Sequence, residues 1–151
     1  AEPTSDPIAL TDAALEAVER FGLAARTMVI SFYWPTLYYA QKLAPGIRTG
    51  YLSAEQDWLD NIQAGQPGRS PWTAPFDAGD YGRSVPRMIK AAGGSAWSVY
   101  WRDLTPERLA EARELELEVG IWTIRRKDEI AAALAMDVDV ITTDRPDWFC
   151  V

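Results

Sequence analysis

The chain has 151 residues, and the 48% of them that are hydrophobic provide for one domain with a buried core rather than a disordered chain. Its net charge of −7 argues against a nucleic-acid surface, because such a surface needs clustered Lys and Arg to neutralise phosphate. The same charge argues against attraction to an anionic membrane.

The N-terminal part of the chain predicts a loop followed by a helix. Residues 1–8 are polar and contain proline, which favours a loop. Thr11 is a candidate N-cap for a helix over residues 12–21, in which apolar side chains recur at helical spacing. Gly22 then supplies a left-handed residue that ends the helix.

The central part alternates strand and helix patterns. Pro35 stands where proline is favoured, in the first turn of a helix. Ser53 to Gln56 has the form of a capping box, which predicts a further helix. The segment after that helix is rich in Gly, Pro, Ser and Asp, so we expect an excursion at the rim of the fold or a mobile loop. The predicted elements are strand 28–33, helix 35–43, strand 47–52, helix 53–64 and excursion 65–83.

The C-terminal part continues the same alternation. Ser84 and Thr105 are candidate N-caps, and Thr105 is followed by Pro106 and Glu107, a strong helix start. Asp128 is a candidate cap for the last helix. The predicted elements are helix 86–92, strand 95–101, a helix from 106, strand 119–124, helix 129–136 and strand 138–143.

Five strands alternating with helices predict a parallel sheet covered by helices. Such units form either a doubly wound sheet or part of a (β/α)8 barrel. A full barrel has about 250 residues, so this chain would supply roughly half of one.

Several short segments, in order and at the right spacing, resemble the C-terminal part of the glycerophosphodiester phosphodiesterase family. The similarity covers about residues 12–149 and implies that the chain, residues 1–151, is the second half of a TIM barrel of that family. The segments are Ser31-Phe32, Pro45 followed by Tyr51-Leu52, Thr105-Pro106-Glu107 with Ala112, Trp122-Thr123 and Thr143-Asp144-Arg145-Pro146.

The resemblance implies hydrolysis of a glycerophosphodiester to an alcohol and glycerol 3-phosphate, in lipid and glycerol metabolism. Family members use two His and a divalent cation, Ca²⁺ or Mg²⁺, held by acidic motifs that precede the region present here. This chain contains no His, which removes the commonest acid/base group. We therefore expect no catalytic or metal-ligating residue in it, and no activity from it alone. We expect it to be a fragment or cleavage product that pairs with the N-terminal half or with another chain.

Substrate contacts are expected at the C-terminal ends of the strands. The resemblance implies that Trp122 forms a wall of the substrate pocket, and Phe32 and Tyr51 are further substrate-binding candidates, with packing as the alternative for each. For Asp144 we favour a loop-capping carboxylate, paired with Arg145 or with backbone N–H groups, over a metal ligand. The run 125–127 favours a solvated turn over an anion site, although Arg125 stands where the family often has Asn.

Two other functions stay open. One is a non-catalytic α/β binding or scaffolding module, and the other is a different phosphate-binding barrel enzyme, which is weakened by the lack of Gly in the last two loops. No apolar run approaches the ~20 residues of a membrane span. The single cysteine, Cys150, excludes an intramolecular disulfide and fits a reducing compartment, so a cytoplasmic location is expected, with a periplasmic or secreted one as the alternative.

Overall fold

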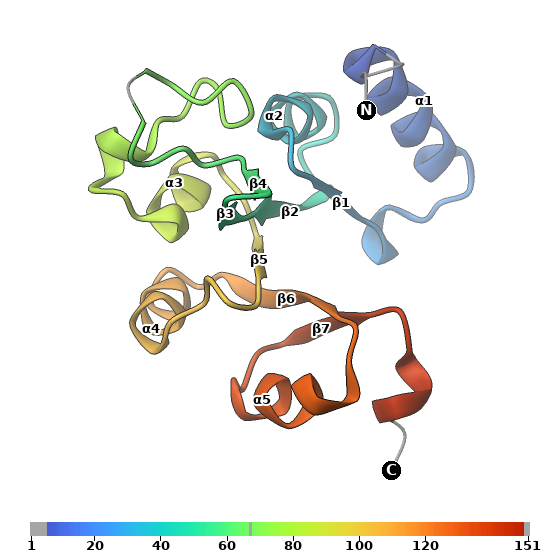
Figure 1. Ribbon diagram of the computed structural model, residues 1–151. Helices are drawn as coiled ribbons and strands as arrows, with labels where there is room; N and C mark the ends of the chain where they lie inside the picture. Colours follow the sequence, from blue (N-terminus) through green and yellow to red (C-terminus); the bar gives the residue numbers. More distant parts are fainter. Residues whose placement is uncertain (1–5, 67, 150–151) are drawn as a thin grey trace.

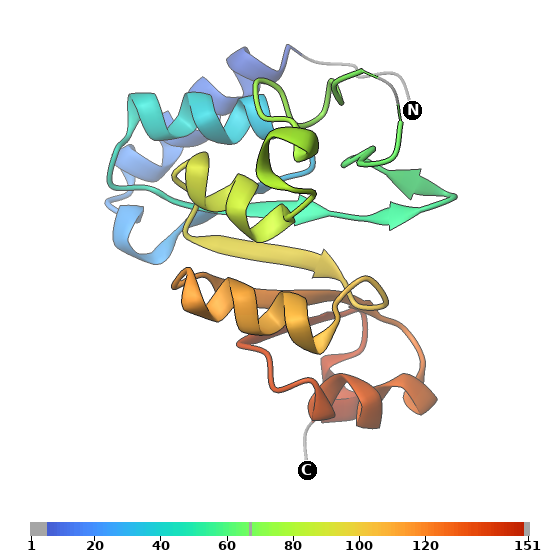
Figure 2. The same cartoon turned by 90° about the vertical axis from the view of Figure 1, so that its left-hand side faces the viewer.

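Five parallel strands form one curled sheet in a computed structural model of the chain, which describes residues 6–66 and 68–149 (Figure 1). Their order in the sheet follows the sequence, and every neighbouring pair is parallel. Figure 2 shows the strands pointing the same way, so their C-terminal ends share one edge. The strands are β1 (Met28–Ser31), β2 (Arg48–Ser53), β5 (Ala96–Tyr100), β6 (Glu118–Ile124) and β7 (Val140–Thr143).

Helices cover the convex, outer face of this sheet and leave the concave, inner face open (Figure 1). Helix α2 packs on β1 and β2, α3 on β5, and α4 and α5 on β6, while α1 packs on α2. This is the predicted half of a (β/α)8 barrel. The helices are α1 (Pro7–Arg20), α2 (Trp34–Leu43), α3 (Val85–Ala91), α4 (Pro106–Glu114) and α5 (Ile130–Ala135). Four short 3-10 helices accompany them: η1 (Ala24–Arg26), η2 (Ala78–Tyr81), η3 (Lys127–Glu129) and η4 (Pro146–Phe149).

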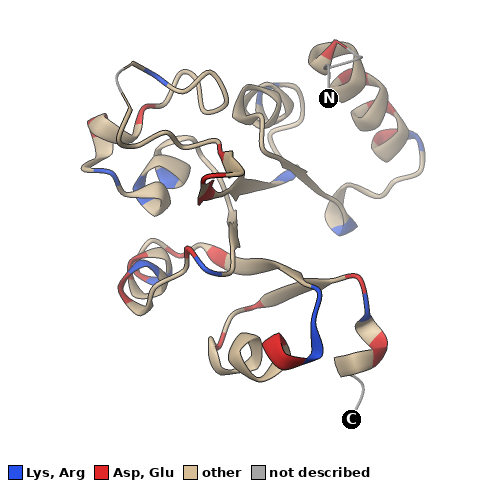
Figure 3. Cartoon of the chain, in the orientation of Figure 1, with Lys and Arg blue, Asp and Glu red and all other residues tan. Residues whose placement is uncertain are grey.

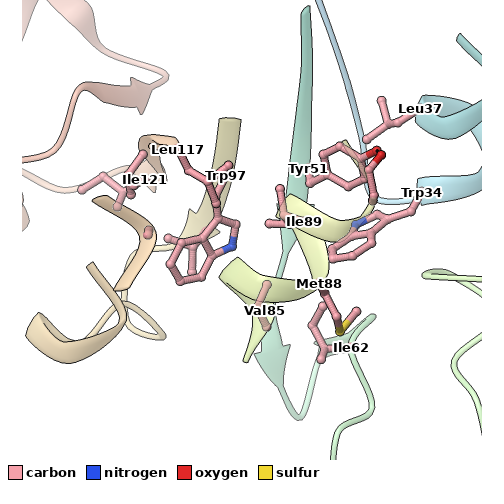
Figure 4. Close-up of a cluster of buried hydrophobic side chains, with 14 of the residues drawn as sticks. Trp34, Leu37, Tyr51, Ile62, Val85, Met88, Ile89, Trp97, Leu117 and Ile121 are labelled. Atoms are coloured by element: carbon pink, nitrogen blue, oxygen red, sulfur yellow. The ribbon is translucent and has the colours of Figure 1, made fainter. Parts of the chain in front are cut away.

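The core lies between the outer face of the sheet and the helices. Trp34 of α2, Tyr51 of β2 and Trp97 of β5 are fully buried there (Figure 4). Each polar atom of these rings has a partner; for example, the indole N–H of Trp97 donates to Ser53 Oγ over 2.8 Å. Burial of a large apolar side chain contributes about 1.5–3 kcal/mol, so these residues hold the helices on the strands.

Two predicted helix starts are confirmed. Ser84 Oγ accepts from the N–H of Arg87 over 3.2 Å, and Thr105 Oγ1 accepts from the N–H of Arg108 over 3.3 Å. Proline occupies the first turn of both helices, where its missing N–H costs no hydrogen bond.

The first helix begins earlier than predicted. The carboxylate of Asp6 accepts from the N–H of Ile8 over 2.9 Å, and Pro7 stands in the first turn, so this pair starts α1. Thr11 is no cap, because its hydroxyl donates to Pro7 O over 2.7 Å inside the helix. The loop predicted for residues 1–8 is therefore wrong at residues 7 and 8, while residues 1–5 lie outside the described residues, as does Cys150.

The helix predicted for residues 53–64 is wrong. The segment is a small antiparallel hairpin of β3 (Glu55–Gln56) and β4 (Leu59–Asp60) that follows β2 (Figure 2). Ser53 caps no helix, because it is the last residue of β2, and its hydroxyl accepts the hydrogen bond of Trp97. Long-range partners therefore override the local capping-box pattern.

The last helix also has a different start. Asp128 pairs with Arg126 instead of capping, and the carboxylate of Glu129 accepts from the N–H groups of Arg125 and Arg126, at 3.2 Å each. The excursion at 65–83 is confirmed, with η2 as its regular element. None of the helices within residues 6–66 and 68–149 has the length and apolar character needed to cross a membrane.

Candidate aromatic site at the strand ends

Four aromatic side chains meet at the C-terminal edge of the sheet, and we name them the aromatic cluster: Phe32, Trp58, Tyr100 and Trp122. Tyr100 and Trp122 are register partners on β5 and β6, so both project from the same face of the sheet, with ring centroids 5.4 Å apart. Phe32, directly after β1, meets the Trp122 ring edge-on at 5.2 Å and 86°. Trp58 lies at the hairpin turn, 5.2 Å from Tyr100 and 6.3 Å from Trp122.

Hydrogen bonds from the strand ends fix the inner members of the cluster. The indole N–H of Trp122 donates to Ser98 O on the neighbouring strand over 3.0 Å. The side-chain amide of the fully buried Asn61 donates to Phe32 O over 3.3 Å and to Leu52 O over 3.1 Å. The ring of Trp122 and the backbone at Phe32 are therefore held in place by contacts within the chain.

The hairpin that carries Trp58 is tied to the loop after β5. Both carboxylate oxygens of Asp103 accept hydrogen bonds from β3, from the N–H of Glu55 over 2.8 Å and from the amide of Gln56 over 2.5 Å. Arg108, at the start of α4, forms an ion pair with Glu55 and donates to Asp103 O over 3.2 Å. Burial disfavours the charge on Arg108, but Glu55, with Asp103 and Glu111, outweighs that effect and raises the pKa of Arg108 above its ordinary value.

Tyr51 is not part of the aromatic cluster. It lies on the outer face of the sheet, fully buried, with its ring 4.9 Å from Trp34 at 90°, and its hydroxyl donates to Ala92 O over 3.3 Å (Figure 4). Burial raises its pKa to about 12, so the phenol stays neutral at physiological pH. The structure thus gives Tyr51 the packing role and does not support the substrate-binding role predicted for it.

The charged side chains after β6 and β7 are paired in the solvent. Arg125 pairs with Asp144 over 3.1 Å, so Asp144 does not pair with Arg145, which binds Asp147 instead. Arg126 pairs with Asp128, and their hydrogen bond lowers the pKa of Asp128. Figure 3 shows the blue segment after β6 next to the red residues of η3, directly before α5. These pairings support the solvated turn over a free anion site.

A metal site would need several acidic, His or Cys side chains at one point. Within residues 6–66 and 68–149 no group of three or more such side chains is placed to hold a metal ion, and the sequence contains no His. Asp144 is exposed and already engaged by Arg125. The described residues therefore do not fit a divalent cation.

The inner face of the sheet is open opposite the aromatic cluster. Ile30 on β1 and Val140 on β7 are 57% and 45% exposed, although both are apolar residues of strands. In the described part of the chain, β1 and β7 each pair with one strand only. The described residues therefore leave the inner face and both edges of the sheet uncovered.

Of the aromatic cluster, the sequence analysis singled out Phe32 and Trp122, whose substrate-binding role stays a prediction, and it did not single out Trp58, because it assigned the segment around Trp58 to a helix. In the structure Trp58 lies in the two-residue turn Asp57-Trp58 between Gln56 and Leu59, at an exposed tip. Tyr100 was recognisable as a strand-end residue.

Comparisons with known proteins place these features in context. The sequence profile described as the Glycerophosphoryl diester phosphodiesterase family matches residues 3–148. A crystal structure from Silicibacter pomeroyi, assigned to the glycerophosphoryl diester phosphodiesterases, is 30% identical with a TM-score of 0.77, over 98% of this chain and 45% of that chain. No curated protein matches the sequence.

Two more distant structures share the fold. A glycerophosphodiester phosphodiesterase from Parabacteroides distasonis is 21% identical with a TM-score of 0.69, over 95% of this chain and 50% of that one. A phosphodiesterase from Oleispira antarctica, in complex with the product sn-glycerol-3-phosphate, is 13% identical with a TM-score of 0.61, over 93% and 47%. The chain therefore spans about half the length of the structures it matches.

Proposed function

Because this chain belongs to the glycerophosphoryl diester phosphodiesterase family, we propose that the complete protein hydrolyses glycerophosphodiesters to an alcohol and glycerol 3-phosphate. The observation that carries the proposal is the aromatic cluster at the C-terminal ends of the strands, the edge at which barrel enzymes bind substrate. In the reaction the oxygen of water bonds to phosphorus, the bond from phosphorus to the alcohol oxygen breaks, and the alcohol leaves with a proton.

This chain contributes binding rather than proton transfer. Trp122 and Phe32 present apolar surface to the carbon atoms of the substrate, with the Trp122 ring fixed by its bond to Ser98 O. Such a wall orients the diester and excludes water around it. The general acid, the general base and the ligands of the cation come from residues outside this chain, because the chain has no His and its described part has no metal-binding group. A divalent cation, Ca²⁺ or Mg²⁺, would neutralise the phosphodiester charge.

We further propose that the partner is the half-barrel that closes the sheet, either the N-terminal half of the same protein or another chain. The unpaired edges of β1 and β7 and the exposed inner residues Ile30 and Val140 support this, since open strand edges and apolar faces favour association. The cysteine content supports a cytoplasmic location, which cell fractionation would separate from a periplasmic or secreted one.

The test is release of glycerol 3-phosphate by the complete protein in the presence of Ca²⁺ or Mg²⁺, measured with a coupled dehydrogenase. We expect turnover that a chelator abolishes, no turnover by this chain alone, and a fall of at least about tenfold in kcat/KM for Trp122→Phe, because the indole wall contacts the substrate. Trp72→Phe is the control, because Trp72 lies outside the aromatic cluster and contacts Tyr33.

A second candidate is a non-catalytic binding or scaffolding module, favoured by the absence of His and of a metal-binding group in the described residues. If the complete protein released no glycerol 3-phosphate from any diester with either cation, hydrolysis would be rejected in favour of this candidate.

A further inference from the structure

We propose that Trp58 is a specificity-determining residue that contacts the alcohol part of the diester, the part that leaves. This inference rests on the proposed function and extends it, because it separates the side chains that hold every substrate from one that distinguishes substrates.

Trp58 is unusual among the large apolar residues because it is 62% exposed and yet fixed. Its ring meets Tyr100 edge-on at 5.2 Å and 83°, and Trp122 at 6.3 Å and 89°. Edge contacts of this kind hold the ring at the mouth of the site while most of its surface stays open to solvent. A Trp that only covered the core would be largely buried, as Trp34 and Trp97 are.

The hairpin below Trp58 is built to stay in place. Two hydrogen bonds to Asp103 and the ion pair between Glu55 and Arg108 tie β3 to the start of α4. On the other side, the N–H of Ala54 donates to the Asn61 side chain over 2.9 Å, and the N–H of Asn61 donates back to Ala54 O over 3.2 Å. A side chain ordered before binding loses little conformational entropy when a ligand arrives, which is the property of a good binding contact.

The position of Trp58 indicates that it contacts the alcohol part of the diester rather than the glycerol phosphate. Trp122 and Phe32 lie at the strand ends and are half-buried, whereas Trp58 lies beyond them on the hairpin, further into solvent. All substrates of the proposed reaction share the glycerol phosphate, which must lie close to the reacting centre at the strand ends. The variable alcohol extends away from that centre, so it meets the most exposed ring of the aromatic cluster.

The experiment measures kcat and KM of the complete protein and of Trp58→Ala on diesters that share glycerol 3-phosphate and differ in the alcohol: methanol, ethanolamine, choline and inositol. We expect KM to rise about five- to tenfold for the larger alcohols, to change less than about twofold for the methyl diester, and kcat to change little. Trp72→Ala, which removes a partly exposed Trp outside the aromatic cluster, should leave all four unchanged.

Glu55→Gln tests the support of the hairpin. Because it weakens the ion pair with Arg108 but keeps the Trp58 ring, we expect the same dependence on the alcohol with a smaller rise in KM. An equal effect of Trp58→Ala on all four diesters, or no effect on any, would overturn the inference while leaving the proposed hydrolysis intact. No release by the unmodified protein would instead reject the proposed function, and this inference with it.

Discussion

Replacement of Asn61 tests whether one buried amide holds the mouth of the site together. Asn61 is fully buried, and its side chain joins three backbone segments: Oδ1 accepts from the N–H of Ala54 over 2.9 Å, and Nδ2 donates to Phe32 O and Leu52 O. In Asn61→Ala the N–H of Ala54, which is also fully buried, loses the acceptor seen in the structure. Leu52 O keeps the indole N–H of Trp34 as a donor over 3.1 Å.

The magnitude follows from these partners. A buried donor left without an acceptor costs about 1–3 kcal/mol, and the weaker bond to Phe32 O and the vacated volume bring the expected total to about 2–4 kcal/mol. The total stability of a domain is about 5–15 kcal/mol, so the loss is large enough to measure. The assay is urea unfolding of the protein, monitored by tryptophan fluorescence. The slope m, the dependence of the free energy of unfolding on urea concentration, should be the same for all variants.

Asn61→Asp is the matched variant, because it conserves volume and keeps the acceptor for Ala54 but sets a carboxylate against two carbonyl oxygens. We expect it to lose at least as much stability as Asn61→Ala at pH 7, whereas Gln66→Ala, at an exposed position, should change the free energy of unfolding by less than about 0.5 kcal/mol. A loss below about 1 kcal/mol for both Asn61 variants would refute the reasoning that this amide is what satisfies the three backbone groups.

Two further predictions concern the core beneath the site. The pKa of Tyr51 is raised by burial to about 12 from 10.0, so its share of stability is complete below pH 10 and is lost as the pH rises through about 12, because the unfolded chain ionises first. That share is on the order of 3 kcal/mol. Tyr51→Phe should therefore reduce the loss of stability between about pH 10 and pH 12, and an unchanged loss would contradict the reasoning. A Cβ at Gly94 would lie 2.6 Å from Ile89 Cγ2 and 2.6 Å from Tyr51 Cε2, so Gly94→Ala should destabilise the protein by about 1–3 kcal/mol. Gly46→Ala, where nothing lies within 4 Å, is the control in the same thermal melts, and equal melting temperatures for the two variants would count against the packing argument.

Much of the fold was predictable because the sequence patterns that indicate its strands and helix starts lie within a few neighbouring residues. Most strands of the sheet are short, largely apolar segments. Helices α3 and α4 start after Ser84 and Thr105, whose side chains cap them within four residues. The start of α1 could also have been read from the sequence, since Asp6 before Pro7 is a cap followed by a first-turn proline. Thr11 was the weaker candidate, because a Thr inside a helix can bond back to the carbonyl four residues earlier.

The hairpin was not predictable in this way, because its partners are distant in sequence. Gln56 bonds Asp103, Glu55 pairs with Arg108, and Ser53 accepts from Trp97, across separations of 47, 53 and 44 residues. A capping-box pattern depends only on four neighbouring residues. It therefore gives no information about hydrogen bonds that these side chains form with distant residues. Trp58 was missed for this reason, and nothing short of the tertiary structure places it over Tyr100.

The role of Tyr51 was open to correction from strand geometry alone. Adjacent residues of a strand point to opposite faces, so Tyr51 and Leu52 cannot both face the inside of the barrel. Tyr51 shares its face with Thr49 and Ser53, which are buried toward the helices, and its register partner is the buried Trp97. The resemblance marked the end of this strand but did not say which face carries the substrate.

The inner face of the sheet differs from the interior of a closed barrel. Its central positions are small, and at the strand starts Arg48 reaches past Ala96 of β5 to pair with Glu118 of β6. A barrel interior is normally filled by layers of large side chains from alternate strands. Side chains of β1 and β7 fill part of this volume, because a Cβ added at Gly50 would lie 2.9 Å from Ile30 Cγ2 and one added at Gly120 would lie 3.3 Å from Val140 Cβ. The three middle strands contribute small residues at their central positions. These residues are Gly50, Ala96, Ser98 and Gly120.

The small residues of the inner face also explain how the aromatic cluster packs. Below it the middle strands carry small residues, so the rings of Tyr100 and Trp122 pack on each other and on Phe32 and Trp58. If the closing half supplies the bulk beneath them together with the charged catalytic groups, the two halves become complementary in volume and in chemistry. Docking of that half would then stiffen the substrate wall at the same time as it completes the reacting centre.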